Sequence, residues 1–245
     1  MENGLIFTGR RILVTGATGG IGSAVVRELV QHGATVLAHG RNTDTLEALA
    51  TETGCETITF NIEEEDSVAS ALNGIEIWGV VNSAGFGGEI ATPMSTDIEV
   101  FDRVISVNTR GALLVTKYAT TSMVAAGKGG AIVNISSQAA LIALWGHISY
   151  AASKAALDSI TRSSSLELGQ YGIRVNSVNP TVVLTDISRD HWTQPHIAGP
   201  FLDRMPLGRW ATPEEVARPI TFLLSDWASM ITGVTLPIDG GFTIV

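Results

Sequence analysis

Tyr150 and Lys154 stand four residues apart in a stretch with helical composition, and together they could perform acid–base chemistry. On a helix, this spacing places both side chains on one face. A free phenol has a pKa of about 10, which makes it a weak acid and a weak base near neutral pH. A neighbouring ammonium group stabilises the phenolate and lowers that pKa, as general acid–base catalysis requires. The pair therefore predicts a proton-transfer site.

Two serines, Ser136 and Ser137, stand at the end of the apolar stretch Ala131–Ser136, upstream of the tyrosine. This stretch has the composition of a buried strand, and the ends of parallel strands are where ligands bind in α/β sheets. A hydroxyl group there can hydrogen-bond a substrate carbonyl and stabilise negative charge that develops on its oxygen. The residues alone leave open which serine does so, and whether either only caps the strand end.

A glycine-rich loop connects the first expected strand to a helix, over residues 15–22 (Thr-Gly-Ala-Thr-Gly-Gly-Ile-Gly). Glycine permits a tight turn and lets a pyrophosphate approach the backbone without meeting a β-carbon. The helix N-terminus then offers free N–H groups and a partial positive charge. A glycine-rich turn without function is the alternative, but the strand–turn–helix context favours a dinucleotide.

Short β-branched runs alternate with longer helical patterns along the chain, as expected of a parallel sheet covered by crossover helices. The expected strands are Arg11–Thr15, Thr35–Ala38, Glu56–Phe60, Ile77–Asn82, Ala131–Ser136, Arg174–Val178 and Val234–Ile238. The expected helices are Ile21–His32, Thr43–Thr53, Gly111–Ala126 and Tyr150–Gly169, with a further helix starting at Thr212. This alternation predicts an α/β fold with a doubly wound, mostly parallel sheet of about seven strands in three α/β/α layers. We expect a single domain over residues 1–245.

The 245-residue composition excludes several classes of function. Hydrophobic residues make up 45% of the chain and charged residues 16%, which is enough apolar material for a sizeable core. The formal net charge of −9 argues against nucleic acid and anionic membranes as partners. A single cysteine, no signal-peptide pattern and no long apolar stretch lead us to expect a cytoplasmic protein outside the membrane. No metal site is expected.

The end of the second strand bears on the choice of nicotinamide cofactor. A carboxylate there usually accepts from the adenine ribose hydroxyls of NAD, whereas an arginine accommodates the 2′-phosphate of NADP. The chain has His39, Gly40 and Arg41 at this point, and its first acid after the strand is Asp44. Arg41 can bind a phosphate with its forked guanidinium group, although a solvated surface arginine is the alternative. NADP(H) is favoured over NAD(H).

These motifs, in this order and at these spacings, resemble the short-chain dehydrogenase/reductase family over nearly the whole chain, from Val14 to Phe242. The resemblance implies a Rossmann-like fold and, usually, a homotetramer, for which we expect the helices Gly111–Ala126 and Tyr150–Gly169 to form an interface. It selects Ser137, which lies thirteen residues before the tyrosine, and adds Asn108 as a catalytic residue. The cofactor-binding residues that follow from the loop, from Arg41 and from the resemblance are Gly16, Thr18, Gly20, Ile21, Gly22, Arg41, Asn61, Ile62, Asn82, Ala84, Gly85, Tyr150, Lys154, Pro180, Val183 and Thr185.

The mechanism implied by the resemblance is hydride transfer between the nicotinamide and a carbonyl carbon. Tyr150 would protonate the carbonyl oxygen, and Lys154 would lower the pKa of Tyr150 and bind the nicotinamide ribose. Ser137 would orient the carbonyl group, and Asn108 would hold a water molecule in the proton relay. Three departures from the family pattern are Ser83 in place of asparagine, Asn61 in place of aspartate, and Thr181 in place of glycine.

Thr181 and the residues that follow it resemble the L-xylulose (dicarbonyl) reductase branch of the family. This resemblance implies a small carbonyl or ketose substrate, or the corresponding alcohol. It places Gln138, His147 and Trp192 in the substrate pocket, under a lid around residues 186–210. For His147 the alternative is a helix cap, and for Trp192 it is packing within the lid.

Two other functions remain open from the sequence. An NAD-dependent polyol or hydroxy-acyl dehydrogenase would use the same groups in the oxidative direction, and the absence of a carboxylate at the strand end argues against it. A non-catalytic dinucleotide-sensing protein is a candidate of a different class. It would be expected to lack the serine, the tyrosine or the lysine, and this chain has all three.

Overall fold

The computed structural model describes residues 5–185, 189–190 and 192–245, and its centre is one seven-stranded parallel sheet. The strand order is β3-β2-β1-β4-β5-β6-β7, and every neighbouring pair is parallel. The strands are β1 (Arg11–Thr15), β2 (Thr35–His39), β3 (Glu56–Ile58), β4 (Gly79–Asn82), β5 (Gly130–Ile135), β6 (Ile173–Pro180) and β7 (Thr235–Ile238). The expected doubly wound α/β fold is confirmed.

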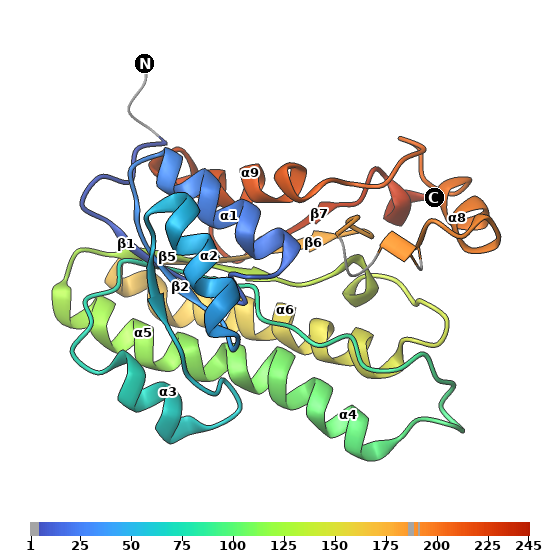
Figure 1. The fold of residues 1–245 in the computed structure, drawn as a ribbon, viewed down its shortest axis with the longest axis horizontal. Helices are drawn as coiled ribbons and strands as arrows, with labels where there is room; N and C mark the ends of the chain where they lie inside the picture. Colours follow the sequence, from blue (N-terminus) through green and yellow to red (C-terminus); the bar gives the residue numbers. More distant parts are fainter. Residues whose placement is uncertain (1–4, 186–188, 191) are drawn as a thin grey trace.

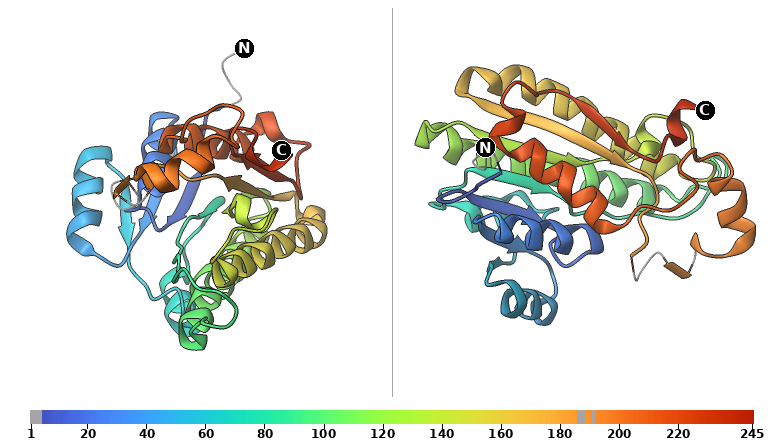
Figure 2. Two further views of the ribbon diagram at one scale, coloured as in Figure 1. Left: turned by 90° about the vertical axis from the view of Figure 1, so that its right-hand side faces the viewer. Right: turned by 90° about the horizontal axis from the view of Figure 1, so that it is seen from above.

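Helices cover both faces of the sheet and complete the three layers (Figure 1). One face carries α1 (Gly20–Gln31), α2 (Thr43–Thr53) and α9 (Pro213–Leu224). The other carries α3 (Glu65–Leu72), α4 (Ile98–Ile105), α5 (Ala112–Ala126) and α6 (Ile148–Leu168). A short helix, α8 (Pro195–Leu202), lies at the end of the molecule near the C-terminus (Figures 1 and 2). None of the described helices is long and apolar enough to cross a membrane.

The strands at the centre of the sheet are buried on both faces, which explains their continuous apolar sequences. In β1, Ile12 and Val14 belong to the core cluster under α1 and α9, whereas Leu13 belongs to the cluster under α3 and α5. Because successive side chains of a strand point to opposite faces, one apolar run supplies both cores. This packing holds the carboxyl ends of β1, β4, β5 and β6 in a fixed row, where the site is built.

The structure differs from the sequence-based expectations mainly at the ends of elements and in three helices. The edge strand β3 ends at Ile58 rather than Phe60, because it pairs with β2 alone and its ladder ends there. Helix α6 starts at Ile148, two residues before Tyr150. Helices α3, α4 and α8 were not expected, since each is only eight residues long and gives a weak periodic signal.

The unexpected helix α4 continues into α5 through one π-helical turn, Ser106–Gly111. Such single π turns inside α-helices occur frequently at functional sites. The turn contains Asn108, whose side chain is buried. The expected helix started at Gly111, and the structure extends the helical segment back through this wider turn to α4.

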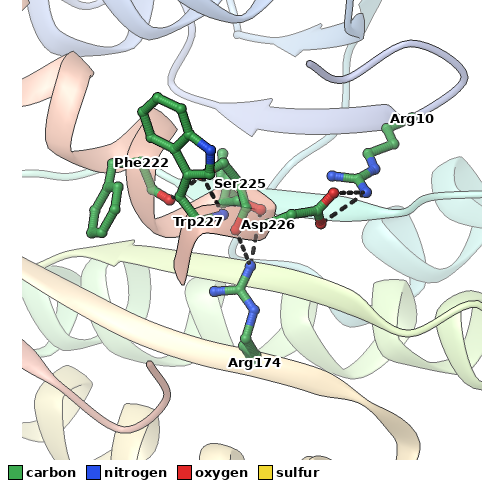
Figure 3. Close-up of polar contacts among 7 residues, drawn as sticks. Arg10, Arg174, Phe222, Ser225, Asp226 and Trp227 are labelled. Atoms are coloured by element: carbon green, nitrogen blue, oxygen red, sulfur yellow. Dashed lines mark hydrogen bonds and ion pairs between the residues drawn. The ribbon is translucent and has the colours of Figure 1, made fainter. Parts of the chain in front are cut away.

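At the amino end of the sheet, Arg174 of β6 holds the C-terminus of α9 (Figure 3). Its guanidinium group donates to the carbonyl oxygens of Leu223, Leu224 and Ser225 at 2.6, 2.9 and 3.0 Å. These carbonyls lack partners within the helix and carry its partial negative charge, so a cation is favoured here. Asp226, next along the chain, accepts from Arg10 in an exposed ion pair.

Candidate active site

A cavity of about 530 Å³ opens at the carboxyl ends of the strands, next to the boundary between β1 and β4 where the strand order reverses direction. Ligands bind at this position in open α/β sheets. The cavity is lined by fourteen of the residues proposed from the sequence, namely Gly16, Gly20, Ile21, Gly22, Gly85, Ser137, Gln138, His147, Tyr150, Lys154, Pro180, Val183, Thr185 and Trp192. The fold therefore gathers the glycine loop, the serine and the tyrosine–lysine pair around one space.

The glycine loop is held in a conformation that other residues could not adopt. Gly16 has φ +62°, and a β-carbon on it would lie 2.8 Å from the backbone of Ala84. A β-carbon on Gly22 would lie 2.2 Å from the carbonyl oxygen of Gly16. Helix α1 then begins with Gly19 as its N-cap, without a capping side chain and without acidic residues in its first turn. Its N–H groups and its positive dipole end face the cavity, and they fit the pyrophosphate of a dinucleotide.

The Ser137 hydroxyl lies close enough to the Tyr150 phenol to lower its pKa, and both side chains line the cavity. The Ser137 hydroxyl oxygen accepts from the backbone N–H of Ala139 at 3.1 Å, which fixes the position of this oxygen at the cavity wall. Lys154 is one helical turn further along α6, and its ammonium group lies 5.6 Å from the centre of the Tyr150 ring. It donates to the carbonyl oxygen of Ile135 at 2.8 Å. The predicted i, i+4 alignment is therefore present.

Burial disfavours the charged form of both Tyr150 and Lys154, so the pKa of the phenol rises and the pKa of the ammonium group falls. Burial raises the pKa of the Tyr150 phenol, and the hydrogen bond from Ser137 partly opposes that shift. Burial lowers the pKa of Lys154 to about 8, and the negative charge of Asp158 partly opposes it. At neutral pH the phenol therefore holds its proton, and most Lys154 side chains are still charged.

Asn108 lies behind the cavity wall rather than in it. Its amide oxygen accepts from the Phe86 N–H at 2.7 Å, and its amide nitrogen donates to the Phe86 carbonyl at 3.0 Å. The same nitrogen donates to Ser153 Oγ at 3.0 Å, and Ser153 donates to the Tyr150 carbonyl. The side chain of Asn108 thus connects the loop after β4 to the helix that carries the tyrosine. A β-carbon on Gly85 would lie 3.5 Å from its amide oxygen and 3.7 Å from the Lys154 nitrogen.

Asn82 also lies outside the cavity. Its amide nitrogen donates to Asn134 Oδ1 at 2.8 Å, across the paired strands β4 and β5. It also lies 3.2 Å from Thr116 Oγ1 on α5, and Asn134 in turn donates to Thr161 on α6. This buried amide chain fastens two helices to the sheet beneath the site.

The residues expected around the adenine end of the cofactor lie away from the main cavity. Thr18 and Arg41 are exposed, and the Thr18 methyl group lies 3.3 Å from the position of a β-carbon on Gly40. The Asn61 amide binds within its own turn, donating to Glu64 and accepting from the Glu63 N–H. Ile62 and Ala84 pack against other residues of the protein. Ile62 lies against Gly111, and Ala84 lies against Gly16.

The three side chains that the sequence assigned to the substrate pocket also line the cavity. Gln138 is 3% exposed, and its amide oxygen has no hydrogen-bond partner among the described residues. His147 occupies the N-cap position of α6 without capping it, and its Nδ1 instead lies 2.8 Å from the Trp145 carbonyl. Trp192 contacts the rings of Phe201 and Trp210 edge-on, with centroid distances of 5.5 and 5.9 Å. Residues 186–188 and 191 of the expected lid lie outside the described residues.

Sequence reasoning missed part of the cavity wall. The stretch Phe86–Ile90 lines the cavity, as do Ser83, Leu144, Thr181 and Val182. The run Gly85-Phe86-Gly87-Gly88 directly after a buried strand was an available signal, since glycine-rich strand ends allow close approach of a ligand. No group of three or more His, Cys, Asp or Glu side chains that could hold a metal ion occurs in the described part of the chain.

A family model described as enoyl-(acyl carrier protein) reductase, within the short-chain dehydrogenases, matches residues 16–243. The L-xylulose reductase of Caenorhabditis elegans is 45% identical, with 97% of each chain covered. The chain belongs to the short-chain dehydrogenase/reductase family. As a member of this family it is an NAD(P)-dependent oxidoreductase, and the glycine loop described above fits the nicotinamide dinucleotide.

Other members of the short-chain dehydrogenase/reductase family are similar over their whole length. The D-erythrulose reductase of Gallus gallus is 39% identical, with 100% of each chain covered. A gluconate 5-dehydrogenase from Burkholderia cenocepacia, solved in complex with NADP and tartrate, is 27% identical and superimposes with a TM-score of 0.94. That match covers 99% of this chain and 98% of the solved one.

Proposed function

We propose that this protein reduces a small hydroxylated ketone or diketone to the corresponding alcohol, with NADPH as the preferred cofactor. The observation that carries the proposal is the meeting of Ser137, Tyr150 and Lys154 with the glycine loop in one cavity. L-xylulose and D-erythrulose, named in the relatives, are the substrates of first choice.

The bound nicotinamide supplies or accepts the hydride, and the protein handles the proton. Tyr150 gives its proton to the carbonyl oxygen, because burial keeps the phenol protonated at neutral pH. Ser137 hydrogen-bonds the same oxygen and holds the carbonyl in line with the phenol. Lys154 places a positive charge beside the phenolate that forms, and it binds the ribose of the nicotinamide. Asn108 keeps the tyrosine helix and the loop after β4 in register. The role assigned to it by the family resemblance is that it would hold a water molecule of the proton relay.

The preference for NADPH rests on the surroundings of Arg41. This arginine is exposed after β2, and no described residue forms an ion pair or hydrogen bond with it. The neighbouring His39 adds little positive charge, because burial lowers its pKa. His39, Gly40 and Arg41 lie at the end of β2, and none of these three residues carries a negative charge that would repel a 2′-phosphate. Arg41→Gln should raise the Kd of NADPH by about 10- to 100-fold and hardly change that of NADH.

The polar end of the cavity suits a substrate with hydroxyl groups. Gln138 offers a buried amide whose oxygen lacks a partner, and such a group regains a hydrogen bond when a substrate hydroxyl reaches it. His147 and Trp192 complete this end. We propose that Gln138 and His147 bind hydroxyl groups and that Trp192 covers the carbon chain.

The test is the rate of NADPH and NADH oxidation with diacetyl, L-xylulose and other ketoses, with Tyr150→Phe as the matched control. We expect turnover with NADPH that the variant loses by a factor of about 100 or more. Turnover with NADH alone would instead indicate an NAD-linked polyol dehydrogenase. Cofactor binding without turnover on any carbonyl compound would indicate a dinucleotide sensor.

We further propose that residues 1–245 form one domain with a lid around residues 186–210, and that four copies assemble. Support for the lid comes from Trp192, which lines the cavity while contacting Phe201 of α8. Sedimentation in solution should give the mass of four 25.8 kDa chains, and a monomer would refute the assembly.

A further inference from the structure

Helix α6 carries a buried acid in line with the proposed catalytic pair. Tyr150, Lys154 and Asp158 follow one another at intervals of four residues, which places them on one face of the helix. Asp158 is 3% exposed, on a helix that packs against β6 and the turn after β5. An ionised carboxylate this deeply buried is costly unless it is hydrogen-bonded and paired with a positive charge.

The hydrogen bonds of Asp158 lead to the other side of the site. Its Oδ2 accepts from the amide nitrogen of Asn179 at 2.9 Å. The same nitrogen of Asn179 donates to the backbone carbonyl of Ser137, also at 2.9 Å. The chain Asp158–Asn179–Ser137 therefore ties the acid to the backbone of the serine whose hydroxyl lowers the pKa of Tyr150. The second carboxylate oxygen, Oδ1, has no partner among the described residues.

Asp158 is the acid that shares a helix face with Lys154. On α6 the titratable groups facing Lys154 are Tyr150 and Asp158. From the neighbouring elements, Lys154 meets the neutral carbonyl of Ile135. The loop after β4 adds Glu89 to the cavity wall, where its carboxylate accepts from the Asp97 N–H. Burial lowers the pKa of Lys154 to about 8, and Asp158 is the charge that opposes this shift.

We propose that Asp158 is a positioning residue of this site, whose carboxylate keeps Lys154 charged and fixes the backbone at Ser137 through Asn179. The proposal rests on the proposed roles of Lys154 and Ser137. Without Asp158, the buried ammonium would lose its proton at a lower pH, and the phenolate formed on Tyr150 would lose its neighbouring charge. The acid thus extends the pH range over which the site works.

The test is the titration of Lys154 in the full-length protein, which needs no turnover. The chain has three lysines, and the other two, Lys117 and Lys128, form exposed ion pairs. NMR of protein labelled with carbon-13 at the lysine ε-carbon therefore gives three signals. We expect the midpoint of Lys154 to fall by about one pH unit in Asp158→Asn. The loss of reductive kcat/KM at high pH should move down by the same amount.

Thr161→Val is the matched control, because it removes a buried hydrogen bond from the same helix without changing a charge. It should lower stability and leave the Lys154 midpoint in place. Asn179→Ala should lower kcat with diacetyl, because Ser137 loses its support, and shift the midpoint less than Asp158→Asn does. Asp158→Ser serves as a second neutral variant should Asp158→Asn fold poorly. An unchanged midpoint in a folded neutral variant overturns the proposal, whereas a shifted midpoint without turnover on any carbonyl overturns only the proposed function.

Discussion

Gly20 lies directly against the side chain of Thr185, so that a β-carbon on Gly20 would be 2.2 Å from the Thr185 methyl carbon. This contact joins the glycine loop after β1 to the segment that follows β6. The two segments are far apart in the chain, and both line the cavity. Gly22, in contrast, is blocked by the backbone oxygen of Gly16.

These two glycines should respond differently to substitution by alanine. Gly20→Ala meets the methyl carbon and the β-carbon of Thr185, at 2.2 and 2.8 Å, so the segment after β6 must shift. The fold should survive this shift at the cavity edge, while NADPH binding weakens by about 10-fold. Thr185→Ser removes the methyl group in the way and should restore part of that affinity. Gly22→Ala meets backbone and should lose about 1–3 kcal/mol of stability, which Thr185→Ser should not restore. Fluorescence titration with NADPH and urea denaturation measure the two effects. Equal behaviour of the two variants would contradict this account.

Replacing Asn108 should damage both stability and catalysis. Asn108→Ala removes three hydrogen bonds and leaves the partly buried Phe86 N–H without its partner. We expect a loss of about 2–4 kcal/mol in the free energy of unfolding, together with a fall in kcat. The matched control is Asn73→Ala at an exposed asparagine, for which a change within about 0.5 kcal/mol is expected. An Asn108→Ala variant as stable as the control would refute the structural role.

The contacts of Arg174 predict a purely structural effect. Arg174→Met removes three donors from the last carbonyls of α9 and should cost about 2–4 kcal/mol of stability without changing the pH dependence of activity. Asp226→Asn, which breaks the exposed pair with Arg10, should cost less than about 1 kcal/mol. Thermal denaturation distinguishes the two, and a larger loss from Asp226→Asn would contradict the interpretation of Figure 3.

The pKa of Lys154 predicts the pH dependence of the wild-type reaction. The positive charge of Lys154 is present below about pH 8 and is lost as the pH rises through that value. The raised pKa of Tyr150 keeps its proton available throughout this range. Reductive kcat/KM should therefore be flat near neutral pH and fall above about pH 8. A rate that keeps rising to pH 9 would show that the charge of Lys154 does not support the reductive step.

Much of the site could be predicted from the sequence because its signals are local. The i, i+4 spacing of Tyr150 and Lys154 fixes one helix face whatever surrounds the helix. The glycines at 16, 20 and 22 report a turn with no room for β-carbons, and the structure has that turn. The apolar strands indicated a doubly wound sheet because buried parallel strands need apolar residues on both faces.

The tertiary structure alone decided which polar residues face the cavity and which are used internally. From the sequence, Asn108 looks like Gln138. Both amide atoms of Asn108 are used in hydrogen bonds to Phe86 and Ser153, whereas Gln138 lines the cavity and its amide oxygen has no partner among the described residues. Asp158 drew no attention in the sequence, since an acid within a helix is ordinarily solvated. Its burial and its hydrogen bond to Asn179 depend on how α6 packs against β6. Spacing along one element is set by local geometry, whereas contacts between distant segments are set only when the sheet and its helices pack.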